Sequence, residues 1–121
     1  MTKVLIVASF ALVLPAIEPA LACSVPYIRT LNNQTVDGHM AARSGRPCSI
    51  RLRNSTGPTT DASIVQRPAN GTVSIGGRNR IIYRSRPGFV GSDAFAYARH
   101  GRDRYNSAVT RTVRVAVTVT P

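Results

Sequence analysis

From residue 23 onward the chain alternates apolar and polar residues in short runs, as strands with one buried face do. In residues 48–53 this alternation places Cys48, Ile50 and Leu52 on one face. Residues 109–119 form the longest such run, and its core-facing positions are four valines: Val113, Val115, Val117 and Val119. No stretch of this part has sustained helical periodicity with caps, so the pattern predicts strands throughout.

Glycine, proline and asparagine separate the apolar runs and mark turns between the predicted strands. The pattern predicts strands at residues 36–41, 48–53, 62–66, 72–75, 80–83, 92–99 and 109–119. Residues 25–31 are either a first edge strand or a tail, and Gly76-Gly77 indicates a hairpin. About seven short strands at this spacing favour an all-β, antiparallel β-sandwich over residues 27–120 rather than an α/β fold.

The first 22 residues have the pattern of a secretory signal peptide. Lys3 supplies a positive start, residues 4–14 are almost wholly apolar, and Ala20 and Ala22 are small residues at the positions a signal peptidase reads. The apolar run is about half the ~20 residues that span a bilayer, which disfavours the alternative of an uncleaved membrane anchor. The sequence therefore predicts a signal peptide at 1–22, one domain at 23–121, and export to the periplasm or the extracellular space.

Two cysteines, Cys23 and Cys48, remain after the predicted cleavage. An even number of cysteines in an exported protein favours a disulfide bond between them. The alternative is lipidation of Cys23, which would be the first residue of the mature chain. That alternative is disfavoured because Ala20 and Leu21 reverse the usual order of a lipoprotein signal.

The mature part is strongly basic, with 15 arginines, no lysine and four aspartates. A net charge of +11 favours contact with a polyanion: anionic lipid headgroups, acidic polysaccharide or nucleic acid. The alternative is an arginine-rich surface that serves only solubility and protects edge strands. The candidate polyanion-binding residues lie in or beside one loop and on the strand after it: Arg99, Arg102, Arg104, Arg111 and Arg114.

One stretch has an ordered set of typed positions. Pro68 precedes Gly71-Thr72-Val73, and the set continues with Tyr83, Gly88, Phe89, Gly91, Asp93, Phe95 and Tyr97. This stretch resembles the bacterial Ig-like domains, with cadherin-like relatives, that occur in tandem on surface and secreted proteins. The resemblance covers about 30 of the 99 mature residues. It implies an Ig-like sandwich that serves in binding, adhesion or display.

The motif positions have structural roles. Gly88 and Gly91 permit turn conformations that other residues avoid, and Phe89 is expected to cap the core. Asp93 is expected to accept backbone N–H bonds. Phe95 and Tyr97 are expected to fill the space between the sheets, with Tyr97 resembling the corner tyrosine of Ig folds, whose hydroxyl bonds nearby backbone.

The chain departs from the Ig-like pattern in two places. Ser85 stands where the family has proline, with a proline at 87 instead, so we expect a shifted turn. Arg99 and the residues after it replace the acidic end of the strand, so calcium binding is not carried over.

Nothing in the sequence predicts an enzyme, a catalytic residue, a metal site, a cofactor or a small-molecule substrate. His39 and His100 lie in polar or glycine-flanked stretches without the spacing of a nucleophile motif or a zinc site. We therefore expect an exported, non-enzymatic Ig-like binding or adhesion-type module with a protein or glycan partner. The alternative is a cationic polyanion-binding protein that uses the arginine-rich loop.

Overall fold

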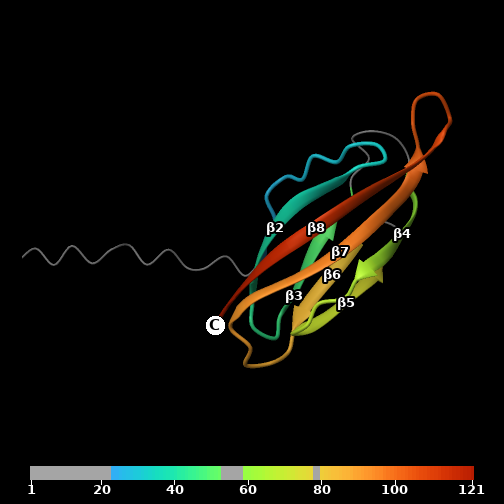
Figure 1. Ribbon diagram of the computed structural model, residues 1–121. Coiled ribbons are helices and arrows are strands. Elements are labelled where there is room, and N and C mark those ends of the chain that lie inside the picture. Colours follow the sequence, from blue (N-terminus) through green and yellow to red (C-terminus); the bar gives the residue numbers. More distant parts are fainter. Residues whose placement is uncertain (1–22, 53–58, 78–79) are drawn as a thin grey trace, which may run out of the picture.

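The computed structural model describes residues 23–52, 59–77 and 80–121, which contain eight β-strands (Figure 1). They are β1 (Cys23–Ser24), β2 (Thr35–Arg43), β3 (Pro47–Arg51), β4 (Thr59–Gln66), β5 (Gly71–Gly76), β6 (Arg80–Ser85), β7 (Gly91–Arg102) and β8 (Ala108–Thr120). The predicted signal peptide, 1–22, lies outside the described residues. Each predicted strand from residue 36 onward is present, and most extend further than expected.

The strands form two packed sheets, in the order β1-β2-β8-β7-β4 and β3-β6-β5. In Figure 1, β8 and β7 cross in front of β3 and β6. The predicted all-β sandwich is therefore confirmed. The hairpin expected at Gly76-Gly77 is also present, because β5 and β6 pair antiparallel.

One pairing differs from the antiparallel pattern expected from the sequence. Strands β2 and β8 are parallel neighbours along nine residue pairs, from Thr35 opposite Thr112 to Arg43 opposite Thr120. After β2 the chain crosses to the other sheet at β3, so the strand that follows β2 does not pair with it. The last strand returns in the same direction as β2 and fills that place.

The core lies between the sheets, where the valines of β8 meet aromatic side chains. Val113, Val115, Val117 and Val119 are all buried, as expected. The rings of Tyr83 and Phe95 stack with centroids 5.6 Å apart. Burial of these large apolar side chains is the main stabilising contribution in a sandwich of this size.

The motif residues around Asp93 tie a turn to the core. The Asp93 carboxylate accepts hydrogen bonds from the backbone N–H of Ala69 (3.1 Å) and Asn70 (3.2 Å) and from the Tyr83 hydroxyl (2.8 Å). The expectation for Asp93 is thus met. The tyrosine hydroxyl bond expected at Tyr97 is instead made by Tyr83, and it reaches a carboxylate rather than backbone.

The glycines and Phe89 of the motif also behave as expected. Gly88 has φ of 83° and Gly91 has φ of 141°, conformations that a residue with a Cβ rarely adopts. Between them, Phe89 folds back onto the core and is partly buried against it. This turn leads the chain from β6 in one sheet to β7 in the other.

The predicted disulfide joins the two sheets. Cys23 in β1 is bonded to Cys48 in β3, and Cys48 is buried. Of the two alternatives for residues 25–31, the structure has the tail: β1 ends at Ser24 and the chain continues without regular structure. Gly38 of β2 leaves room for this segment, because a Cβ there would lie 2.7 Å from the Ile28 side chain.

Candidate functional site

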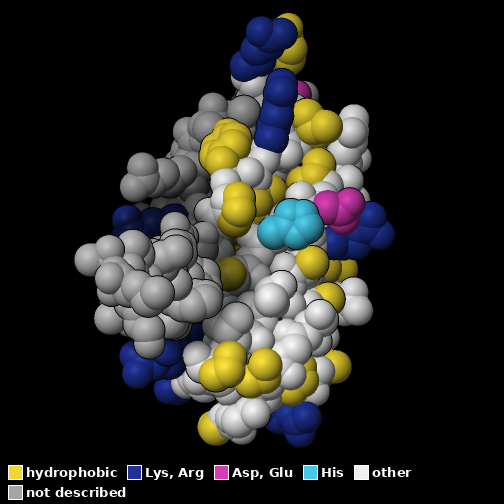
Figure 2. Space-filling view, turned by 90° about the vertical axis from the view of Figure 1, so that its left-hand side faces the viewer, with side chains coloured by type: hydrophobic (Ala, Val, Ile, Leu, Met, Phe, Trp, Pro, Cys, Tyr) yellow, Lys and Arg dark blue, Asp and Glu magenta, His cyan; other side chains and the backbone are white. Residues whose placement is uncertain are grey.

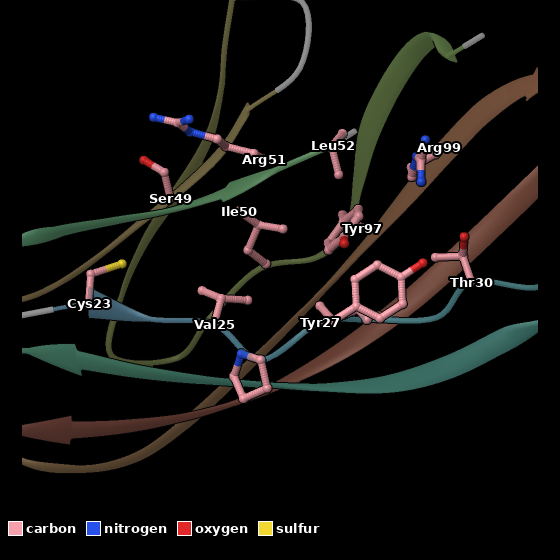
Figure 3. Close-up of a pocket in the computed structure, with 12 residues that line it drawn as sticks. Cys23, Val25, Tyr27, Thr30, Ser49, Ile50, Arg51, Leu52, Tyr97 and Arg99 are labelled. Atoms are coloured by element: carbon pink, nitrogen blue, oxygen red, sulfur yellow. The ribbon is translucent and has the colours of Figure 1, made fainter. Parts of the chain in front are cut away.

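A pocket of about 370 Å³ opens along one side of the sandwich, between residues 23–30 and β3 (Figure 3). Val25 and Ile28 line it from the irregular segment, and Ile50 and Leu52 line it from β3 and the residue after it. Tyr97 and Arg99, which are both buried, line it from β7. We call this hollow the arginine pocket; the disulfide at Cys23 anchors one of its walls.

Two arginines are buried beside each other at this end of the sandwich. Arg99 in β7 is 4% exposed, and Arg111, directly opposite it in β8, is 1% exposed. The Nε of Arg111 donates a hydrogen bond to the Asn32 side-chain oxygen at 2.9 Å. This bond ties Arg111 to the segment that follows the pocket wall, so the guanidinium is held in place.

The surroundings of Arg99 are electropositive. Burial lowers the pKa of Arg99, and the nearby charge of Arg111 lowers it further, while Tyr97 and Tyr27 act in the opposite direction. Burial and the neighbouring charge of Arg111 thus both act against a positive charge at Arg99.

Two tyrosines border the buried guanidinium. Burial raises the pKa of Tyr97 to about 12, an effect that Arg99 partly offsets, so the phenol is neutral at physiological pH. Tyr27 is 80% exposed, and Figure 3 shows its ring across the pocket with the hydroxyl directed toward the side where Thr30 and Arg99 lie. The pocket thus offers phenol hydroxyls beside a cation.

The five candidate polyanion-binding arginines do not form one surface. The structure brings Arg99 and Arg111 together, but inside the sandwich rather than on it. Arg114 lies on the outer face of β8 in an ion pair with Asp37 at 3.3 Å. Pairing of β7 with β8 brings these strands together, but alternate residues of a strand point to opposite sides, so Arg99 and Arg111 are separated from the exposed candidates.

The other two candidates, Arg102 and Arg104, are exposed near the loop that projects beyond the sheets at the end of β7 (Figure 1). Arg102 donates to the Asn106 carbonyl at 2.8 Å, and Arg104 lies over the Tyr105 ring at 5.1 Å from its centroid. On the face that Figure 2 shows, some dark-blue side chains lie next to each other at the top, and the others lie separately toward the edges. The basic side chains of that face therefore form no extended patch.

The sequence contained a signal for the buried pair. In β7, Arg99 has the same parity as Phe95 and Tyr97, which face the core; in β8, Arg111 has the same parity as Val113. Arg114 has the opposite parity and points outward. The alternation of inward and outward residues, continued to the ends of β7 and β8, predicts that Arg99 and Arg111 are buried. The sequence prediction grouped these arginines by their distance from a loop and did not use this alternation.

The two histidines lie on strands of the larger sheet. His100 contacts Ser63 Oγ through Nε2 at 3.3 Å and Thr110 Oγ1 through Nδ1 at 3.1 Å. A hydroxyl beside Nδ1 does not stabilise an imidazolium as a carboxylate does in a catalytic triad. His39 is exposed on β2. Within residues 23–52, 59–77 and 80–121, no three His, Cys, Asp or Glu side chains are grouped to hold a metal ion.

Neither the protein-family models nor the curated proteins contain a match to this chain. In the part of the chain that the structure describes, no helix has the length and apolarity needed to span a bilayer.

Proposed function

We propose that this protein is an exported, non-enzymatic binding module with an Ig-like sandwich, and that it recognises its ligand in the arginine pocket. The observation that carries the proposal is a pocket lined in about equal parts by polar and apolar surface, with the buried Arg99 among its lining residues. A concave pocket in which polar groups converge beside apolar side chains is a usual form of a small-ligand site.

Export is supported by the first 22 residues and by the disulfide. The apolar run at residues 4–14 and the small residues before Cys23 have the form of a cleaved leader. The Cys23–Cys48 bond is of a kind that persists in oxidising compartments. The periplasm and the extracellular space both fit these features.

The Ig-like assignment rests on the motif from Pro68 to Tyr97 and on the contacts its residues make. Asp93, Tyr83 and the glycines around Phe89 hold a turn and a strand crossing in place. These residues are buried or engaged with backbone. The motif therefore accounts for folding, and recognition is left to the pocket, which lies farther along β7 at Tyr97 and Arg99.

The proposal is tested with protein recovered after export from cells that express the full chain. Its intact mass should match residues 23–121 less two hydrogens and rise by two on reduction; a mass larger by a diacylglycerol group would refute a soluble module. Methyl signals of Ile28 and Ile50 are then followed by NMR against charged, apolar and sugar fragments. We expect shifts at these signals and none at Ile64 and Ile75; no pocket shift with any fragment would refute the site.

A second candidate function is binding of a polyanion through the exposed loop. The specific observation in its favour is that Arg102, at the end of β7, and Arg104, in the projecting loop that follows, are both exposed (Figure 1). Guanidinium groups in such a place are accessible to phosphate, sulfate or carboxylate groups of a polymer. This candidate uses different residues from the arginine pocket, so the two are separable by mutation.

A further inference from the structure

The two sheets end in four edge strands, β1 and β4 in one sheet and β3 and β5 in the other. Strand β1 is only two residues long and is bonded through Cys23 to Cys48 of β3. Strand β3 faces residues 23–30 across the arginine pocket. Strand β4 carries the exposed Asp61, and register shifts interrupt its pairing with β7. Short strands, covering segments, charges and bulges are the usual means by which a sheet edge is protected.

Strand β5 has none of these protections within the part of the chain that the structure describes. In Figure 1 it lies beyond β6, on the side away from β3. Its sequence, Gly-Thr-Val-Ser-Ile-Gly, contains no charged residue and no proline, and it pairs with β6 in one regular register over its whole length. A regular, uncharged edge strand without proline is able to pair with a further strand.

The backbone groups of β5 alternate between β6 and the outside of the sheet. Immediately before β5, the N–H of Arg86 donates to the carbonyl of Asn70 at 2.9 Å, in the same register as the strand pair. Hydrogen-bonded and non-hydrogen-bonded pairs alternate along an antiparallel ladder, so the N–H and C=O groups of Gly71, Val73 and Ile75 are directed away from β6. No hydrogen bond from another described residue reaches these outward groups.

The charge beside β5 determines what kind of strand fits there. Arg80 and Arg84 of β6 are exposed and alternate with buried residues, so they lie on the outer face of the sheet. They stand opposite Gly76 and Thr72 of β5, which are small, and Arg51 of β3 stands opposite Arg80 on the other side. Strands β3, β5 and β6 contain no Asp or Glu. A second copy of this chain would add like charges to the same face, which is unfavourable between neighbouring strands.

We propose that β5 binds, as an added antiparallel strand, an extended segment of a partner protein with acidic residues at alternate positions. This surface is separate from the arginine pocket, and the inference goes beyond the proposed function. The outward backbone groups of Gly71, Val73 and Ile75 supply the hydrogen bonds of the added pair. Acidic side chains on the outer face lie on the same side as Arg80 and Arg84, which makes the pairing selective for acidic strands.

The probe is a capped peptide of the sequence Glu-Val-Glu-Val-Glu-Val-Glu, added to the exported protein. Its valines stand opposite Val73 and Ile75, so its glutamates lie on the side of the arginines. With saturating peptide, the amide hydrogens of Val73 and Ile75 should exchange about tenfold more slowly, because the added strand accepts their hydrogen bonds. The amides of Thr72 and Ser74, which already bond β6, should change by less than about twofold.

Two further peptides separate the charge of the strand from its backbone pairing. Lysine in place of each glutamate keeps the strand and reverses its charge. N-methylation of the valines keeps the charge and removes the N–H groups that bond β5. Calorimetry should show that both peptides bind about tenfold more weakly than the acidic peptide. Equal binding of the lysine peptide overturns the inference, and so does equal binding of the methylated peptide, which would then bind only as a polyanion.

Variants of the protein localise the contact. Ile75→Pro removes an outward N–H at a position where an edge strand accepts proline, whereas Ile75→Thr keeps that N–H. The proline variant should bind the acidic peptide about tenfold more weakly, and the threonine variant should stay within about twofold. Arg80→Ser with Arg84→Ser should weaken binding about fivefold, whereas Arg102→Ser with Arg104→Ser, an equal loss of charge elsewhere, should stay within about twofold. Equal effects within either pair overturn the inference.

The outcomes are distinguishable from those of the proposed function. If Ile75→Pro does not fold, amide exchange at Val73 and Ile75 in the unmodified protein still decides. Unchanged exchange at both amides overturns the inference, while shifts at Ile28 and Ile50 with small fragments still support the binding module. Slowed exchange at both amides supports the inference even where no fragment shifts the pocket signals.

Discussion

Asp93 is the most highly bonded carboxylate among the described residues. Besides the Tyr83 hydroxyl and the backbone of Ala69 and Asn70, the N–H of Ala94 contacts it at 2.9 Å. All four groups donate, so the site requires an acceptor at both carboxylate oxygens. This requirement explains why an acid is buried in a chain with so few of them.

Replacing Asp93 by asparagine should therefore destabilise the sandwich. The amide nitrogen cannot accept a hydrogen bond and would face a donor, so we expect the free energy of unfolding to fall by about 2–4 kcal/mol. Urea unfolding measures the change. Asp61→Asn, at an exposed position of β4, is the control and should change stability by less than about 0.5 kcal/mol; similar values for the two variants would contradict the role of Asp93.

Because of Tyr97, we expect the stability of the fold to change with pH in the alkaline range. Its folded pKa, about 12, lies above the usual value of about 10, so the native state retains the phenol proton more firmly than the unfolded state. The contribution is complete below pH 10 and is lost as pH rises toward 12. Burial also raises the pKa of Tyr83, with Asp93 adding to it, which has the same sign.

Tyr97→Phe should flatten this dependence. Between pH 8 and pH 11 we expect the wild-type protein to lose about 1.4 kcal/mol more stability than the variant, from one unit of the pKa shift. Urea unfolding at the two pH values measures it. Tyr105→Phe, at an exposed ring, should leave the wild-type dependence unchanged. Parallel pH profiles for wild type and Tyr97→Phe would show that the phenol is not the cause.

At the scale of elements, the disulfide holds the pocket wall. It joins residues 25 positions apart and connects β1 of one sheet to β3 of the other. β1 contributes only two residues to the sheet, so the covalent bond is the main constraint on where residues 25–30 begin. The position of this pocket wall therefore depends on the disulfide, of which only Cys23 lines the pocket.

Replacing both cysteines, as Cys23→Ser with Cys48→Ala, should lower the free energy of unfolding by about 3.5 kcal/mol on the chain-entropy estimate. Residues 25–30 should also exchange their amide hydrogens faster, whereas β7 should not, as long as the domain is folded. Reduction of the unmodified protein provides the matched comparison. Unchanged exchange at residues 25–30 would mean that packing of Ile28 over Gly38 holds the wall alone.

The whole molecule carries a net charge of +11, and most of its arginines are exposed. Whether a polyanion contacts the projecting loop or the surface at large is decided by comparing two double variants with equal loss of charge. Arg102→Ser with Arg104→Ser changes the loop, and Arg84→Ser with Arg86→Ser changes exposed positions elsewhere.

If the loop is the contact, heparin should release the loop variant at lower salt than the control variant. For duplex DNA, the slope of log affinity against log salt should decrease by about 1 for each arginine lost from the contact. Equal elution of the two variants would show that only total charge matters. Indifference of the unmodified protein to both polymers at physiological salt would exclude a polyanion function.

Much of this protein is determined by local patterns in the sequence. Alternation predicted the strands and the core valines of β8, glycines marked the turns, and two cysteines after a predicted leader predicted the disulfide. These features depend on neighbouring residues, whose geometry is fixed by the period of a strand. The alternation also indicated that Arg99 and Arg111 face the core, although the prediction had assigned both to a loop-centred group of arginines.

Only the tertiary structure decided which distant residues meet. The sequences of β2 and β8 do not predict that these strands pair in parallel. A strand has the same alternation of inward and outward residues whether its neighbour is parallel or antiparallel. The Asp93 carboxylate accepts a hydrogen bond from Tyr83 rather than from Tyr97, because the Tyr83 hydroxyl lies next to it across the core. The arginine pocket exists because the disulfide sets residues 25–30 against β3 above Arg99, a contact between segments that no local pattern specifies.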